Sequence, residues 1–164
     1  TGGWRADRAE SPAGGMGGMG IHMVDTMIGL CGPIKDVHCL SLRRALVVDI
    51  DDTTSMLFRF ESGITGYLGT IGATTATQRV QIFGSEGTAE IRQERHFEAR
   101  PMHGEPEIVD FGPFDKEKAE LEAFADAITG TAPYPLPNDQ AIHGISVFEA
   151  VMKSAVSGET VAVG

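Results

Sequence analysis

A succession of short apolar segments and glycine-containing loops between residues 34 and 93 constrains the fold of this chain most. Two of the loops, Glu61-Ser62-Gly63 and Gly84-Ser85-Glu86-Gly87, have the length and glycine position of β-hairpin loops. Strands joined by hairpins pair antiparallel, so the pattern predicts a mostly antiparallel sheet. The expected strands lie around Val37 and Cys39 and at 45–50, 55–60, 64–71, 79–83 and 88–92, with edge strands at 95–99 and 107–111.

Apolar residues at helical spacing flank this run of strands on both sides. A first helix is expected at about 21–31, where Gly32 followed by proline ends it. A second is expected at 115–130, because Asp115 is a residue type that caps helix N-termini. A third, at about 138–158, follows a proline-rich linker. The core-facing stripe predicted for this last helix comprises Ile142, Ile145, Phe148, Met152 and Ala155.

One helix, a run of antiparallel strands and then two helices is the element order of the α+β class. We therefore expect an open-faced, mostly antiparallel mixed sheet with helices packed on one face, and a short added strand at 161–163. A chain of 164 residues is long enough for one hydrophobic core, so a single domain over 1–164 is predicted. The other sheet face is left uncovered, and a homodimer is its simplest cover. Candidates for that face are Leu57, Tyr67 and Leu68.

The composition excludes several classes of partner. A formal net charge of −10, with no lysine or arginine cluster to offset it, repels nucleic-acid phosphates and anionic lipid. No segment approaches the roughly 20 apolar residues of a membrane span and no signal peptide is recognisable, which predicts a cytoplasmic protein. Cys31 and Cys39 lack a C-x-x-C spacing and are expected to be buried free thiols. The chain begins at Thr1, where no element starts, so we expect it to be part of a longer protein.

Five glycines lie between residues 14 and 20, directly before the first expected helix. Gly15-Met-Gly17-Gly-Met-Gly20 matches the G-x-G-x-x-G pattern of dinucleotide-binding turns. That motif works only behind a buried strand, and residues 7–13 are too polar to form one. Arg43-Arg44 would suit a 2′-phosphate, so dinucleotide binding stays open as the minor interpretation. The favoured interpretation is that the glycines let the loop pack closely against a neighbouring backbone or cofactor.

His22 and Asp25 lie three residues apart on the first expected helix, so their side chains project from the same side. Gly18 lies one turn earlier on that side. An imidazole beside a carboxylate is suited to proton transfer or to holding a substrate hydroxyl. A local pair without function is the commoner meaning of this spacing, and both interpretations stay open.

A metal site is not expected, because no third ligand has the spacing to join His22 and Asp25. His143, near the start of the last helix, is expected to be structural or solvated. The aspartates at 49, 51 and 52 indicate a solvated turn at a strand end. The remaining histidines also lack ligand spacing; they are His38, His96 and His103.

Three stretches of the sequence together resemble the C-terminal domain of the glucose–fructose oxidoreductase/inositol dehydrogenase (Gfo/Idh/MocA) family. The first is Trp4-Arg5 with the glycine run and His22-x-x-Asp25. The second joins residues 65–71 to Val80-Gln-Ile-Phe-Gly-Ser-Glu-Gly-Thr-Ala-Glu90. The third joins Leu121-x-x-Phe124 to residues 141–155. In this order and spacing they cover nearly the whole chain.

The resemblance implies a two-domain, NAD(P)-dependent oxidoreductase that acts on a sugar, a polyol or a similar hydroxyl or carbonyl compound. An N-terminal Rossmann domain, absent from this chain, would bind NAD or NADP and supply a catalytic lysine. The fold implied for this chain is the dihydrodipicolinate/glyceraldehyde-3-phosphate-dehydrogenase-like C-terminal domain. Such a domain supplies the open sheet face for a homo-oligomer and part of the substrate pocket, and alone it should be inactive.

By the same resemblance, His22 falls on the catalytic histidine of the family, and Arg5, Gly18 and Asp25 fall in the substrate-binding pocket. Many members carry an aspartate four residues before that histidine, where this chain has Gly18. The departure favours either another substrate or another proton path. It also motivates an alternative function, which is a non-catalytic ligand-sensing or assembly module with a degenerate dehydrogenase site.

Overall fold

The computed structural model describes residues 7–164. The chain divides into two compact units, one built from the chain up to Thr74 together with Pro135–Gly164, and the other from Thr75–Tyr134. Each unit contains a four-stranded sheet in which all neighbouring strands pair antiparallel. Because the described residues also form three α-helices, the α+β class is confirmed, with the strands divided between two sheets.

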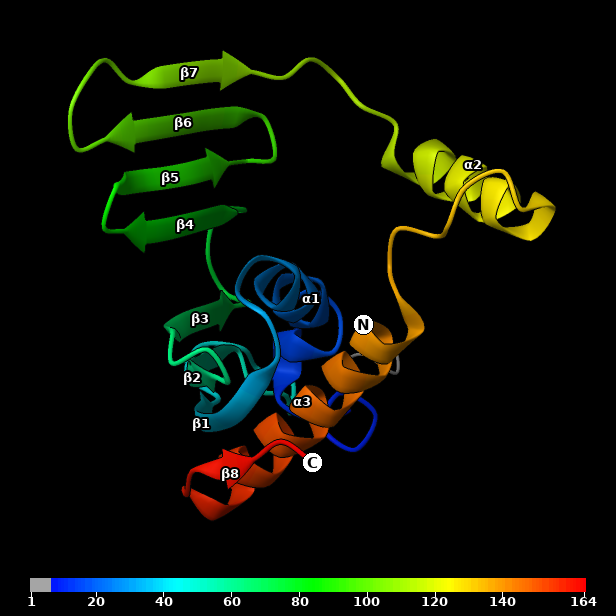
Figure 1. Cartoon of the computed structure of the whole chain (residues 1–164). Helices are drawn as coiled ribbons and strands as arrows, with labels where there is room; N and C mark the ends of the chain where they lie inside the picture. Colours follow the sequence, from blue (N-terminus) through cyan, green and yellow to red (C-terminus); the bar gives the residue numbers. More distant parts are fainter. Residues whose placement is uncertain (1–6) are drawn as a thin grey trace. The chain divides into compact units, whose positions relative to one another are not determined.

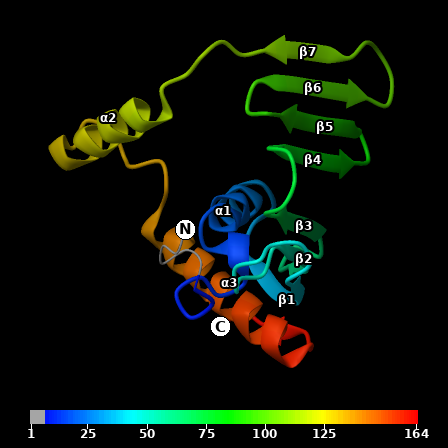
Figure 2. The ribbon, with the colours of Figure 1, turned by 180° about the vertical axis from the view of Figure 1, so that it is seen from behind.

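The first unit holds a sheet with the strand order β3-β2-β1-β8 and the helices α1 and α3 (Figure 1). The predicted hairpin joins β2 to β3, and Gly63 in its loop has the left-handed φ of 86° that favours glycine. Figure 2 shows these elements from behind. Their bounds are α1 Gly20–Cys31, β1 Ile34–Leu42, β2 Thr53–Phe60, β3 Thr65–Ile71, α3 Asn138–Ser157 and β8 Val161–Ala162.

The hydrophobic core of the first unit lies between one face of its sheet and the helices α1 and α3. Alternate residues of β2 point into this core, as the two-residue period of a strand requires. Gly32 ends α1, as predicted, with a φ of 86°. The largest buried apolar side chains of the core are Met16, Val24, Ile34, Val37, Met56, Phe58, Phe60, Val147 and Val151.

The stripe predicted to bury α3 is wrong at two of its positions. Ile142 and Ile145 are 68% and 62% exposed. The prediction selected the largest apolar side chains, whereas the side of α3 that faces α1 and β1 consists partly of small residues. The buried residues of α3 are Gly144, Val147, Ala150, Val151 and Ser154.

The opposite face of the first sheet carries exposed apolar side chains, as expected. Leu57 and Tyr67 are cross-strand neighbours and are 59% and 63% exposed. Leu40 and Ile71, on the flanking strands, are exposed as well. The placement of Leu68 on this face is wrong, because neighbouring residues of a strand point to opposite faces and Leu68 packs against the core.

Residues 43–52 form a loop, so the strand expected at 45–50 is wrong. The loop folds around Asp52, which is 3% exposed and therefore does not belong to a solvated turn. The Asp52 carboxylate accepts hydrogen bonds from backbone N–H groups and from the Thr53 hydroxyl, and these bonds lower its pKa to about 2. Backbone donors committed to a carboxylate are not free for a strand ladder. These donors are the N–H groups of Leu46, Ala45 and Arg44.

The second unit holds a sheet with the strand order β4-β5-β6-β7. The hairpin predicted at 84–87 joins β4 to β5. The prediction of an edge strand at 95–99 is wrong, because β6 pairs with both β5 and β7 and is therefore an interior strand. Helix α2 is capped by Asp115, which accepts a hydrogen bond from the Lys118 N–H, and ends at Gly130, as predicted. The bounds are β4 Arg79–Gly84, β5 Gly87–Arg92, β6 His96–Pro101, β7 Glu107–Asp110 and α2 Lys116–Thr129.

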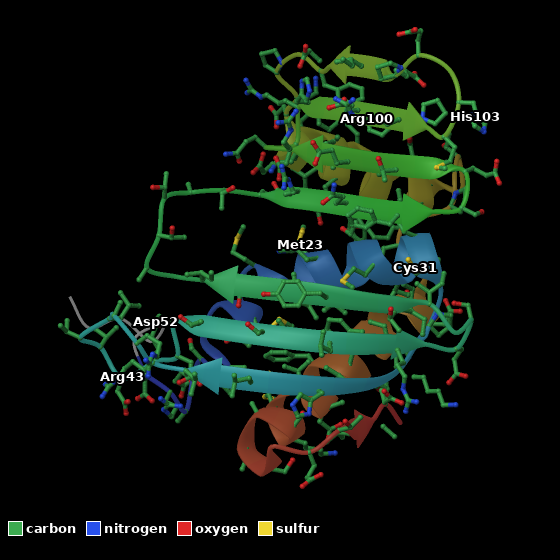
Figure 3. The ribbon with its side chains drawn as sticks, turned by 90° about the vertical axis from the view of Figure 1, so that its left-hand side faces the viewer. Met23, Cys31, Arg43, Asp52, Arg100 and His103 are labelled. Atoms are coloured by element: carbon green, nitrogen blue, oxygen red, sulfur yellow. The ribbon has the colours of Figure 1, made fainter. Side chains whose placement is uncertain are left out.

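Both cysteines are free thiols, as predicted. Cys39 is buried in β1, where burial, and secondly the charge of Asp51, raise the pKa of its thiol to about 11. Cys31, labelled at the end of α1 in Figure 3, is only half-buried, so its predicted burial is wrong. Within residues 7–164, no helix has the length and apolar character needed to cross a membrane.

Candidate functional site

The glycine run before α1 packs as a tight turn against the first sheet. Residues 8–13 form turns, and a short 3-10 helix covers Gly14–Met16. Within the described part of the chain, no strand precedes this run, only an isolated bridge between residues 7 and 49. The run therefore lacks the strand that would deliver a pyrophosphate to the helix N-terminus. Close packing on a backbone is confirmed at Gly14, where an added Cβ would overlap the carbonyl oxygen of Asp51.

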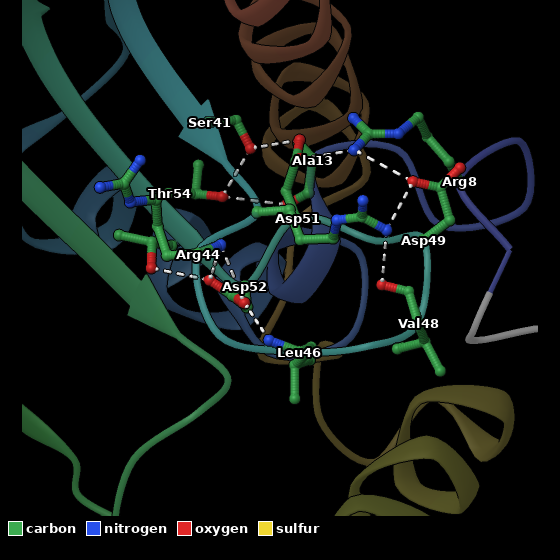
Figure 4. Close-up of polar contacts among 12 residues, drawn as sticks. Arg8, Ala13, Ser41, Arg44, Leu46, Val48, Asp49, Asp51, Asp52 and Thr54 are labelled. Atoms are coloured by element: carbon green, nitrogen blue, oxygen red, sulfur yellow. Dashed lines mark hydrogen bonds and ion pairs between the residues drawn. The ribbon is translucent and has the colours of Figure 1, made fainter. Parts of the chain in front are cut away.

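A group of polar residues, which we call the Asp51 cluster, ties the segment before the glycines to the sheet (Figure 4). Arg8 Nη2 donates to Asp51 Oδ1 at 2.9 Å, and Ser41 Oγ donates to Asp51 Oδ2 at 2.8 Å. The Thr54 hydroxyl, 2.8 Å from Ser41 Oγ, donates to the Ala13 carbonyl oxygen at 3.3 Å. Asp51 is 8% exposed, so the solvated turn predicted for it is wrong. The cluster instead fixes the path of the chain into the glycine run.

His22 lies on the first turn of α1 with its side chain exposed. Among residues 7–164, none forms a hydrogen bond to its ring. Gly18, four residues earlier, has no atom within 4 Å of a Cβ built on it, whereas a Cβ on Gly17 would lie 3.7 Å from the Phe148 ring. The first turn of α1 therefore presents an exposed imidazole, and the turn before this helix leaves open space at Gly18.

Asp25 lies one turn after His22, and its hydrogen-bond partner is Gln140 of α3. Gln140 Nε2 donates to Asp25 Oδ1 at 2.6 Å and to the Asp25 carbonyl oxygen at 3.3 Å. The sequence analysis missed Gln140, although a signal for it exists. Gln140 lies four residues before Gly144 and seven before Val147, in line with the buried stripe of α3, where a polar side chain needs a partner.

The remaining predicted residues lie apart from this pair. Arg5 falls outside the described residues. His143 is structural, as expected, because its Nε2 accepts a hydrogen bond from the Ile34 N–H at 2.9 Å and so joins α3 to β1. In the second unit His96 Nδ1 lies 2.7 Å from Asp110 Oδ1. In the described ranges, no three histidine, cysteine, aspartate or glutamate side chains are grouped in a way that suits a metal ion.

The arrangement on α1 is suited to the transfer of one proton. An exposed imidazole accepts or donates a proton near neutral pH. Asp25, half-buried and held by a neutral amide, keeps a carboxylate one helical turn away from His22. The buried thiol of Cys39, with its raised pKa, is not available as a nucleophile. The exposed imidazole of His22 therefore has the chemistry to exchange a proton with a hydroxyl or carbonyl group.

A family model for the GFO/IDH/MocA C-terminal domain matches residues 1–90, which is more than half of the chain. No curated protein matches the chain. Several solved structures share its fold over about half of their own length. A protein from Desulfitobacterium hafniense described as an NADPH-dependent oxidoreductase superposes with a TM-score of 0.88 at 22% identity, covering 99% of this chain and 51% of that chain.

Two further structures have the same fold. Aldose–aldose oxidoreductase from Caulobacter crescentus, complexed with glycerol, gives a TM-score of 0.82 at 22% identity over 98% of this chain and 50% of its own. Levoglucosan dehydrogenase in complex with NADH gives a TM-score of 0.85 at 17% identity, over 99% of this chain and 53% of its own. The chain thus spans about half the length of the structures it matches.

Proposed function

Because the chain belongs to the Gfo/Idh/MocA family as a C-terminal domain, we propose that it is the substrate-binding half of an NAD(P)-dependent oxidoreductase. The substrate class is a sugar, a polyol or a similar hydroxyl or carbonyl compound. The observation that carries this proposal is the exposed His22 on the first turn of α1, directly after a glycine run that leaves open space at Gly18. The similarity in fold between this chain and an aldose–aldose oxidoreductase and a levoglucosan dehydrogenase supports the substrate class.

The reaction needs a second domain for its cofactor. In the proposed enzyme a Rossmann domain, N-terminal to this chain, holds NAD or NADP, and the nicotinamide supplies the acceptor or donor for a hydride. The two units described here act together as one C-terminal domain, since single solved structures cover 99% of the chain. The open backbone at Gly18 suits close approach of a bound group, because no side chain fills that space.

His22 is the proposed acid–base residue. In the oxidative direction the cofactor held by the other domain would accept the hydride, and the hydroxyl proton of the substrate would pass to the imidazole of His22. Asp25 binds substrate or supports the imidazole from the following turn. Arg5 is proposed as a further substrate ligand. Gly18 leaves room for the substrate where many family members place a carboxylate.

This function is tested on the complete protein that contains the chain. We expect nicotinamide absorbance to change on at least one member of a panel of sugars, inositols and their oxidised forms, with NAD or NADP. Cofactor binding without turnover of any panel member would favour the ligand-sensing or assembly module instead. The chain alone should give a flat calorimetric trace with NADH and NADPH, since its glycine run lacks the preceding strand.

The exposed face of the first sheet is the proposed dimer interface. Leu57 and Tyr67 form the centre of an apolar surface that also includes Leu40 and Ile71. Light scattering should report about twice the chain mass of 17.4 kDa. Leu57→Arg should yield a monomer, whereas Val156→Arg, at a 91% exposed position on α3, should not. An unchanged mass of the Leu57→Arg variant would contradict this interface.

A further inference from the structure

We propose that His38 makes the contact between two copies of this chain dependent on pH, so that the dimer dissociates as the imidazole of His38 gains a proton. This inference rests on the dimer interface of the proposed function, because His38 lies on the same face of the first sheet. It adds a regulatory property to that face, which is opposite to the one that packs against α1 and α3.

His38 belongs to the row of residues that contains the centre of the proposed interface. The strand register places His38 on β1 opposite Leu57 on β2, and Leu57 opposite Tyr67 on β3. All three side chains are exposed. Leu40, two residues further along β1, projects to the same side as His38 and is exposed as well. A second copy that covers Leu57 and Tyr67 therefore also covers the imidazole.

A depression in the surface beside His38 gives the second copy a place to enter. It has a volume of about 350 Å³, and its lining includes His38, Leu57, Arg59, Thr65 and Thr160. In a symmetric dimer the second copy presents the same apolar side chains, and one of these can fill the depression and exclude water from the imidazole. A neutral imidazole tolerates this burial, whereas a protonated one loses the hydration of its charge.

The other ionisable groups on this face of the sheet do not compensate a positive charge at His38. They are Asp36 on β1, Arg59 on β2 and Tyr67 on β3. Both carboxylate oxygens of Asp36 accept hydrogen bonds from Arg59 Nε, at 2.9 Å and 3.0 Å. The hydrogen bond to Asp36, and secondly the charge of Asp36, raise the pKa of Arg59. The carboxylate nearest to His38 along β1 is thus committed to a guanidinium, and on the β8 side the neutral Thr160 lines the depression.

The sign of the pH effect follows from the difference between the two states. In the separated copies His38 is exposed to water and can carry a proton at little cost. In the dimer the same proton adds a charge to an apolar contact, once in each copy, so proton binding favours the separated copies. The dissociation constant of the dimer should therefore rise between about pH 8 and about pH 5.5 by about 10-fold to 100-fold, the usual range for coupling between two binding equilibria.

The test measures the dissociation constant of the dimer on the complete protein, by analytical ultracentrifugation of a dilution series at these two pH values. His38→Gln keeps a polar side chain that cannot gain a proton, so its dissociation constant should change by less than about threefold between them. His103→Gln replaces an exposed histidine in the loop between β6 and β7. It is the matched control and should dissociate at low pH as the parent does.

Proton uptake separates the charge of His38 from a structural effect of its replacement. Dilution calorimetry of the parent at about pH 6, in two buffers that differ in ionisation enthalpy, should show that dissociation takes up protons. His38→Gln should remove this uptake. A substitution that only disturbs the packing of the interface weakens the dimer equally at both pH values.

The outcomes distinguish this inference from the proposed interface. A parent dimer with the same dissociation constant at both pH values would overturn the pH dependence and leave the interface intact. Dissociation of His38→Gln at low pH, to the same extent as the parent, would overturn the role of His38. A parent that is monomeric at pH 8, or a dimer that Leu57→Arg leaves unchanged, would instead remove the proposed interface and this inference with it.

Discussion

Ser154 of α3 provides the sharpest test of how the first unit is held together. Ser154 is fully buried, and its hydroxyl makes two hydrogen bonds. Ser154 Oγ accepts a hydrogen bond from the Cys39 N–H at 2.8 Å and donates one to the Glu159 carbonyl oxygen at 2.6 Å. Strand β8 pairs with β1 only at residues 36 and 37, so beyond that point the hydroxyl replaces the missing strand partner. It therefore joins helix, sheet and the turn before β8.

Ser154→Ala should destabilise the chain by roughly 1–3 kcal/mol, because the Cys39 N–H is left buried without a partner, whereas the carbonyl of the exposed Glu159 can bond to water. The measurement is urea unfolding followed by circular dichroism. The matched control is Ser157→Ala, whose exposed hydroxyl accepts from the Glu159 N–H, and which should change stability by no more than about 0.5 kcal/mol. Equal stability of the two variants would refute the reasoning.

Three other substitutions probe the loops and the sheet edge. Gly14→Ala should destabilise the chain by about 2–4 kcal/mol in the same urea assay, because Gly14 has a left-handed φ of 55° and an added Cβ would overlap the Asp51 carbonyl oxygen. The pKa of Asp52 is lowered to about 2 in the folded chain, below the usual value of about 3.9, so its carboxylate stabilises the fold above that value and loses this effect as the pH falls towards 2. Asp52→Asn should therefore melt earlier than the parent at pH 7, and the two melting curves should converge between about pH 4 and pH 2. His143→Ala should cost about 1–3 kcal/mol by leaving the buried Ile34 N–H unpaired, and hydrogen exchange at that amide should accelerate.

Most elements of the fold could be predicted because their signals are local. The cap at Asp115 and the stops at Gly32, Gly130 and Gly158 depend only on neighbouring residues, and each lies where predicted. The two hairpins likewise follow from glycine positions in short loops. These features need no knowledge of what the element packs against.

The errors have a common physical cause, which is competition from distant partners. Residues 45–50 have the composition of a strand, but the backbone N–H groups of Ala45 and Leu46 donate to the carboxylate of Asp52 instead of to a neighbouring strand. In α3 the large side chains of Ile142 and Ile145 predict a buried face, whereas Gly144 and Ser154 occupy it. Small residues at a helix contact carry little hydrophobic signal, so a pattern weighted by size misplaces the face.

The candidate site could be predicted only in part for the same reason. His22 and Asp25 are close in sequence, and helix geometry alone puts them on successive turns of α1, with Gly18 in the turn before that helix. Gln140 is 115 residues from Asp25, so its contribution becomes visible only once α1 and α3 are seen in contact. The Asp51 cluster likewise joins residues that are far apart in sequence, since Arg8 donates to Asp51, 43 residues away.

The measurement that tests the central claim most directly is the turnover of the complete protein with and without the imidazole of His22. The substrate is the best compound from the panel, and the signal is the absorbance of the reduced nicotinamide. His22→Ala should lower kcat by about 10²-fold to 10⁴-fold, the range expected for a general acid–base group, with cofactor affinity unchanged. A variant that turns over as fast as the parent would contradict the assignment of this domain as the acid–base half of the enzyme.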